Sequence, residues 1–139
     1  MISIAHSFTG AALGAVVAHP LPAVLLGLAS HAALDEVPHR DYSKPLHAVV
    51  DALASLALLM GAAAWLRRHG LDSRLPGFWC GAVAGVLPDL EVAIGYFLHQ
   101  KQRFPTHNGL LPHPQVRTSL GIWTQVVTVA LDALIFVYL

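Results

Sequence analysis

The feature of this sequence that most constrains its fold is a series of four long apolar stretches separated by short polar segments. The stretches cover residues 8–34, 46–66, 78–98 and 119–139. A helix needs about 20 mostly apolar residues to cross the ~30 Å hydrocarbon core of a bilayer. Each of the last three stretches has the length of one crossing, so the sequence predicts membrane-spanning helices.

The first stretch is longer and is interrupted by His19-Pro20-Leu21-Pro22. Proline removes a helical donor and biases the residue before it away from the helix. We therefore expect a hairpin of two short helices, near residues 2–18 and 21–36. Because both helices are short for the hydrocarbon core, the hairpin would be thin or only partly submerged in the bilayer. The predicted fold is all-α, a polytopic membrane bundle of four to five transmembrane helices. Residues 1–139 are expected to form a single integral membrane domain.

The charged residues support a membrane location. Only 12% of the chain is charged, against about a quarter in soluble domains. A soluble bundle, the less favoured alternative, would carry cations along its outer helix faces. Here every lysine and arginine lies between apolar stretches, at Arg40, Lys44, Arg67, Arg68, Arg74, Lys101, Arg103 and Arg117. The expected partner is membrane lipid. Because the net charge is zero, no nucleic-acid partner is expected.

Histidine is unusually frequent, with nine residues against eight lysines and arginines. In a five-helix topology, the N-terminus and loops 38–45 and 100–116 share one face. Seven histidines fall at or near it: His6, His31, His39, His47, His99, His107 and His113. Five of the eight cations also fall there, which by the positive-inside rule predicts the cytoplasmic side of the inner membrane.

The densest polar segment spans residues 30–42. His31 and Asp35 are four residues apart and share a helix face, and His39 and Asp41 follow in a turn after Pro38. His47 and Asp51 again share a face. Imidazole and carboxylate are the ligands that zinc, manganese or iron accept when cysteine pairs are absent. The segment predicts a divalent metal, zinc first, with manganese or iron as alternatives. The competing interpretation is a set of cap and turn residues joined by hydrogen bonds.

Two other regions carry ionisable groups at unusual places. Asp89 follows Pro88 inside an apolar span, where ionisable groups are expensive and usually functional. A straight helix puts Asp89 ~15 Å from the histidine face, so it reaches a metal site only through a broken helix or a sunken cavity. His107 lies in a polar loop and could equally be a solvated histidine. Asp132, in the last stretch, could be a helix-packing hydrogen-bonder or part of the site.

Three short motifs resemble a known family. His6 followed by Gly10 and Gly14, the Pro88-Asp89-Leu-Glu91 motif and the Arg103-Phe-Pro-Thr-His107 motif resemble the membrane-bound metal-dependent hydrolases. These are small bacterial and archaeal inner-membrane proteins, more distantly similar to zinc-dependent phospholipases C. Segment 31–42 resembles the HxxLDxxPHxDY element of a short-chain branch. The resemblance implies His6, Asp89 and His107 as ligands, and the chain departs from the family pattern at Glu91, Gln102 and Asn108.

Together these features predict a metal-dependent hydrolase that cleaves a phosphoester or ester bond of a lipid with metal-activated water. The expected metal ligands are His6, His31, Asp35, His39, His47, Asp89 and His107. Asp35 or Asp89 would bridge a second metal, and Arg40 and Arg103 would bind phosphate. One alternative is a metal or proton transporter with Asp51, Asp89 and Asp132 along its path. Another is a non-catalytic membrane protein with a structural metal.

Overall fold

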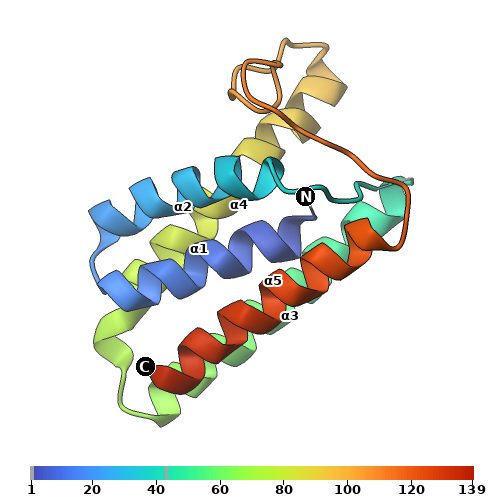
Figure 1. Ribbon diagram of the computed structural model, residues 1–139. Coiled ribbons are helices and arrows are strands. Elements are labelled where there is room, and N and C mark those ends of the chain that lie inside the picture. The colour runs from blue at the N-terminus through green and yellow to red at the C-terminus, as the bar shows by residue number, and fades with distance from the viewer. Residues whose placement is uncertain (1, 43) are drawn as a thin grey trace.

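The computed structural model describes residues 2–42 and 44–139, without the side chains of residues 96 and 97. Its elements, in chain order, are α1 (Ser3–Val17), α2 (Pro20–Asp35), α3 (Pro45–Arg68), the short 3-10 helix η1 (Asp72–Arg74), α4 (Leu75–Leu98) and α5 (Leu120–Tyr138) (Figure 1). The described residues form no strand, and one isolated parallel bridge joins His39 to Gln115. The predicted all-α fold is confirmed.

Three segments are long and apolar enough to cross a membrane: Pro45–Arg68, Asp72–Gly95 and Leu120–Tyr138. The predicted hairpin of two shorter helices is also present. At 15 and 16 residues, α1 and α2 measure about 22–24 Å, which is less than the ~30 Å hydrocarbon core. The hairpin turns at Ala18, whose φ of 55° ends α1, and Pro20 begins α2.

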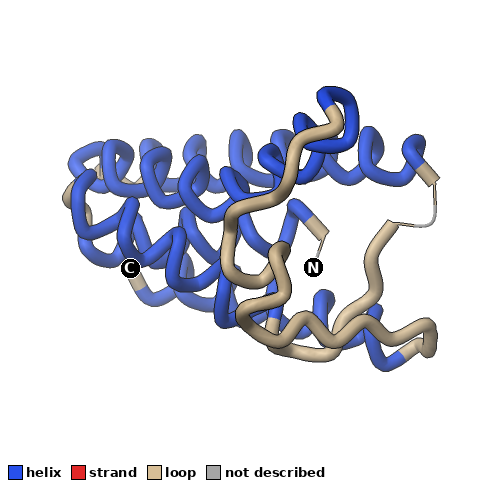
Figure 2. The backbone as a smooth tube through the Cα atoms, turned by 90° about the horizontal axis from the view of Figure 1, so that it is seen from above, coloured by secondary structure: helices blue, strands red, loops and turns tan. Residues whose placement is uncertain are grey.

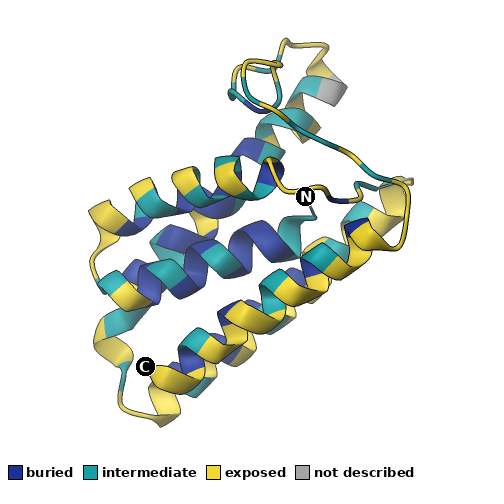
Figure 3. Ribbon diagram, in the orientation of Figure 1, coloured by how far each residue is buried: buried dark blue, intermediate teal, exposed yellow. Residues whose placement is uncertain are grey.

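Small side chains fill much of the interior of the bundle, and many large apolar side chains lie on its outside. Ala5, Ala11 and Ala15 are completely buried in α1, whereas Leu53, Leu90 and Leu131 on other helices are more than half exposed. Figure 3 shows α1 largely buried and the outer faces of α3 and α5 largely exposed. Water would penalise such a surface, whereas lipid tails solvate it and close helix contacts favour small residues. The surface therefore suits a bilayer.

Helix α1 lies at the centre of the bundle and contacts all four other long helices. Its contact with α4 depends on glycine. A Cβ atom added at Gly10 would lie 2.2 Å from the carbonyl oxygen of Gly81, and one at Gly14 would lie 2.1 Å from that of Gly77. The two backbones therefore touch directly. Small residues four positions apart, such as Gly10 with Gly14 and Gly81 with Gly85, predict close helix packing from the sequence, and the structure confirms it.

The N-terminus and both long loops meet at one end of the bundle, opposite the C-terminus (Figure 2). The Tyr42 hydroxyl accepts the Ser3 N–H at 2.9 Å, which attaches the loop segment 36–42 to the start of α1. The Val116 N–H donates to the His39 carbonyl at 2.8 Å, which joins that loop to loop 99–119. The two loops and the start of α1 thus form one polar layer, as the five-helix topology predicted.

Candidate metal centre

The centre of the polar layer is Asp35, the last residue of α2, which is completely buried. Its Oδ2 lies 3.1 Å from His31 Nε2 and 3.3 Å from His107 Nε2. Its Oδ1 lies 3.1 Å from His6 Nε2. The Thr106 hydroxyl also donates to Oδ2 at 2.6 Å. Helix α1, helix α2 and loop 99–119 therefore converge on one carboxylate.

His31 is oriented by the backbone of α4. Its Nδ1 donates to the carbonyl oxygen of Gly85 at 2.7 Å, which leaves the lone pair on Nε2. That lone pair is directed toward Asp35 and toward His107 Nε2, 3.5 Å away. The His6 ring stacks on His31 with 3.8 Å between the ring centroids. A backbone acceptor of this kind sets the tautomer that a metal-binding histidine needs.

Asp89 joins this group although its helix is unbroken. Helix α4 continues through Pro88 to Leu98. Loop 99–119 then folds back along α4, so that His107 Nε2 comes to 3.9 Å from Asp89 Oδ1, the same distance as His31 Nε2. The site is therefore sunk below the end of α4, which is the second of the two expected arrangements. His6, His31, Asp35, Asp89 and His107 are called the first ligand group below.

A second ligand group shares Asp35 and adds His39, Asp41 and His113. His39 Nδ1 donates to the Val37 carbonyl at 2.7 Å, which leaves its Nε2 lone pair for the site. That Nε2 lies 2.9 Å from His113 Nε2 and 3.1 Å from Asp41 Oδ1. His113 Nε2 is also 3.9 Å from Asp35 Oδ1. The two oxygens of Asp35 thus face different sets of histidines.

The loop residues of the second ligand group are electrostatically coupled. Burial opposes ionisation of Asp41, but hydrogen bonds with His113 and His39 outweigh it and hold the pKa of Asp41 far below its usual value. The same hydrogen bond with Asp41 raises the pKa of His113, with burial opposing the shift. Asp41 is therefore an anion at neutral pH, as a metal ligand must be.

The donor atoms fit a bound cation. Ligand atoms ~2.1 Å from a tetrahedral zinc lie about 3.4 Å apart. In the first ligand group, the Nε2 atoms of His31 and His107 and Oδ2 of Asp35 are 3.1–3.5 Å apart. Several buried atoms in the described part of the chain also lack a hydrogen-bond partner, namely Nδ1 of His6, Nδ1 of His107 and Oδ2 of Asp89. These buried groups could hold a metal ion.

The structure brings together six of the seven predicted metal ligands. Only His47 lies apart: it is exposed at the start of α3 and belongs to none of the ligand clusters found among the described residues. The two predicted phosphate-binding residues, Arg40 and Arg103, are exposed beside the site. Glu91 is the second acidic residue of the Pro88-Asp89-Leu-Glu91 motif, and here it anchors loop 99–119. Its carboxylate accepts the N–H groups of Arg103 at 2.7 Å and Phe104 at 2.9 Å.

Sequence reasoning missed three members of the site. His113, Asp41 and Thr106 were not among the predicted ligands or catalytic residues, although each lies close to a residue that was. Asp41 follows His39 by two positions, and Thr106 immediately precedes His107. His113 is flanked by two prolines, which restrict a loop backbone and could have served as a signal.

Two carboxylates of the transporter alternative have local structural partners. Asp51 Oδ2 accepts the Ile4 N–H at 3.2 Å and the Tyr42 hydroxyl at 2.6 Å, so it caps the start of α1. Asp132 accepts the Thr9 hydroxyl at 2.6 Å across the α1–α5 contact. This is the helix-packing role considered for Asp132.

Comparisons of the chain with known protein families, with curated proteins and with solved structures find no match. The function of the site is therefore argued from its own geometry and chemistry.

Proposed function

We propose that this protein is a membrane-embedded hydrolase that uses two divalent metal ions, zinc with manganese or iron as alternatives, to cleave a phosphoester or ester bond of a lipid. One observation carries the proposal. Asp35 has Oδ2 within 3.3 Å of His31 and His107 of the first ligand group and Oδ1 3.9 Å from His113 of the second. A buried carboxylate shared in this way between two sets of imidazoles is the arrangement that a bridging ligand requires.

The protein's own residues would divide the work as follows. The first ligand group would hold one ion and the second ligand group the other, with His31 and His39 oriented by the carbonyls of Gly85 and Val37. Divalent ions bound there would supply Lewis acidity and a water activated near neutral pH. Thr106 holds Oδ2 of Asp35 in place through its hydroxyl.

Substrate would enter at the partly exposed edge of the site. The side chains of Asp89, Asp41 and His113 are 25%, 30% and 20% exposed, whereas His6, His31, Asp35 and His39 are completely buried. Arg40 and Arg103 lie on the loops next to this edge, and their guanidinium groups suit a phosphate. A lipid is favoured because the edge lies at the end of apolar helices, where headgroups would be found.

The resemblance to membrane-bound metal-dependent hydrolases supports the same assignment. The three residues that it implies as ligands, His6, Asp89 and His107, come from α1, α4 and loop 99–119. All three contact or closely approach His31 or Asp35. A transporter is less favoured, because Asp51 and Asp132 already have local structural partners.

The test is metal loading followed by a hydrolysis assay in detergent micelles. The purified protein is stripped of metal, reloaded with zinc, manganese or iron, and assayed against lipid phosphoesters and esters. Asp35→Asn should lose metal and activity, because it removes the shared charge while keeping the side-chain shape. Asp132→Asn, which changes another buried carboxylate outside both ligand groups, should retain both. Metal binding without hydrolysis of any lipid would indicate a structural metal site and would refute the proposed hydrolase activity.

A further inference from the structure

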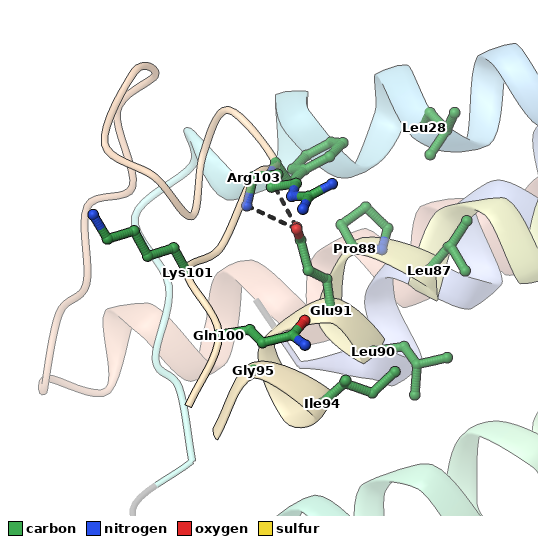
Figure 4. A pocket seen from close by; sticks show the side chains of 11 residues that line it. Leu28, Leu87, Pro88, Leu90, Glu91, Ile94, Gly95, Gln100, Lys101 and Arg103 are labelled. Carbon is green, nitrogen blue, oxygen red and sulfur yellow. Dashed lines mark hydrogen bonds between the residues drawn. The ribbon is translucent and has the colours of Figure 1, made fainter. Parts of the chain in front are cut away.

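Beside the metal centre lies a cavity of about 460 Å³ between α2, the end of α4 and loop 99–119, called the groove below (Figure 4). Its volume falls within the roughly 300–1,000 Å³ range of small-molecule sites. Part of its lining is apolar, with Leu28 from α2 and Leu87, Leu90 and Ile94 from α4. The polar part of the lining comes mainly from the loop, with Gln100, Lys101 and Arg103. The groove is therefore amphipathic.

The two parts of the groove match the two zones of a bilayer. Leu87, Leu90 and Ile94 belong to the candidate span Asp72–Gly95. Lys101 and Arg103 belong to loop 99–119, which forms part of the polar layer at that end of the bundle. An acyl chain along the leucines and a headgroup beside the cations would therefore lie at the depths that a lipid already occupies in the surrounding leaflet.

The charge of the groove favours an anion. Its one carboxylate, Glu91, has both oxygens engaged by the N–H groups of Arg103 and Phe104. In the described part of the chain, no carboxylate forms an ion pair with the side chain of Lys101 or Arg103. Arg103 lies over the groove and Lys101 extends outward from the loop at its rim (Figure 4), and basic residues placed beside transmembrane helices attract anionic lipid headgroups.

The groove also adjoins the metal centre. Phe104 lines it, and the same ring packs against His31 and His107 with 5.1 Å and 5.6 Å between centroids. Pro88, another lining residue, immediately precedes Asp89. A second cavity of about 480 Å³ near Asp41 has a more apolar wall, but its single guanidinium, from Arg40, is accompanied by the Asp41 carboxylate, so it suits an anion less well.

We propose that the groove binds an anionic glycerophospholipid from the surrounding membrane, with its phosphate at Lys101 and Arg103 and an acyl chain along Leu87, Leu90 and Ile94. Binding depends on the groove alone. That the bound lipid is also the substrate rests on the proposed function, and it names the substrate class as an anionic phospholipid.

The experiment measures binding of phosphatidylglycerol and phosphatidylcholine to metal-free full-length protein in neutral detergent, by native mass spectrometry. We expect preference for phosphatidylglycerol. The double variant Lys101→Gln with Arg103→Gln should bind it about 30-fold more weakly, at the ~1 kcal/mol that each cation near a membrane surface contributes. The matched control is Arg67→Gln with Arg68→Gln, in the last turn of α3 at the opposite end of the bundle from the groove, and it should bind phosphatidylglycerol normally. Circular dichroism checks that all variants remain helical.

A pair of groove-filling variants locates the acyl chain. Ile94→Trp places an indole in the groove and should abolish binding, whereas Val126→Trp fills the second cavity and should leave it unchanged. The reverse pattern, equal binding of the two lipids, or full competition by soluble glycerol phosphate would overturn the proposal. Hydrolysis is then assayed separately on the metal-loaded protein. Binding without cleavage refutes the proposed function but not the groove, and cleavage without groove binding refutes only the groove.

Discussion

The substitution Gly85→Ala tests whether the contact between α1 and α4 builds the metal site. A Cβ at position 85 would lie 2.4 Å from the carbonyl oxygen of His6, where ordinary contacts begin at 3.4 Å. The helices must therefore separate by roughly 1 Å at this point. The movement displaces two things at once: His6 itself, and the Gly85 carbonyl that accepts the His31 Nδ1–H.

Two magnitudes follow. Overpacking of this kind typically costs about 1–3 kcal/mol of folding free energy. Loss of an orienting partner of a metal ligand typically lowers metal affinity about 10 to 100-fold. We therefore expect Gly85→Ala to lower both the unfolding temperature in detergent and the metal affinity measured by competition with a chelating dye.

Two other glycines provide matched controls. Gly61 in α3 has open space where a Cβ would be placed, so Gly61→Ala should leave metal affinity unchanged and should stabilise the helix by up to ~1 kcal/mol. Gly77→Ala meets the Gly14 carbonyl at 2.3 Å, far along α1 from His6, so it should destabilise the bundle with a smaller effect on metal affinity. Wild-type metal affinity in Gly85→Ala would refute the reasoning.

Three further predictions concern individual ligands and their charge. His113→Ala should reduce the metal content from two ions to one per chain by elemental analysis, whereas His47→Ala should leave it unchanged; equal loss in both would contradict the second ligand group. Metal occupancy should fall as the pH drops through about 6–7, because protonated imidazole cannot bind a cation. Because a hydrogen bond with Asp41 raises the pKa of His113, the ion of the second ligand group should be the first to leave as the pH falls, and simultaneous loss of both ions would disprove this. Glu91→Ala should weaken metal binding although Glu91 is not a ligand, because it anchors the loop that carries His107; unchanged affinity would show that the loop holds itself in place.

Much of the fold could be predicted because lipid imposes simple rules on sequence. Apolar length predicted the three long helices, and the prolines at 20 and 22 predicted the hairpin. The small-residue stripes at Gly10 and Gly14 and at Gly81 and Gly85 predicted close helix packing, although only the structure shows that the two stripes pack against each other. Local spacing also predicted His31 with Asp35, because residues four apart on a helix share a face.

The rest of the site depends on how loop 99–119 folds back, which no local pattern determines. The four-residue spacing correctly predicted that His31 and Asp35 share a helix face. The same spacing suggested a pair of His47 and Asp51, but Asp51 instead caps α1 and His47 is exposed. The depth of Asp89 indicated a broken helix as readily as a sunken site. His113 enters the site through the backbone pairing of the two loops, between partners more than 70 residues apart.

The most direct test of the central claim, a metal pair shared by Asp35, is an anomalous-scattering map of the purified, metal-loaded protein. The account predicts two peaks within about 4 Å of each other, one on each side of the Asp35 carboxylate. One should lie among His31, Asp89 and His107, and the other among His39, Asp41 and His113. Both peaks should be absent in Asp35→Asn. A single peak that persists in this variant, or no peak near Asp35 in the wild type, would contradict the shared centre.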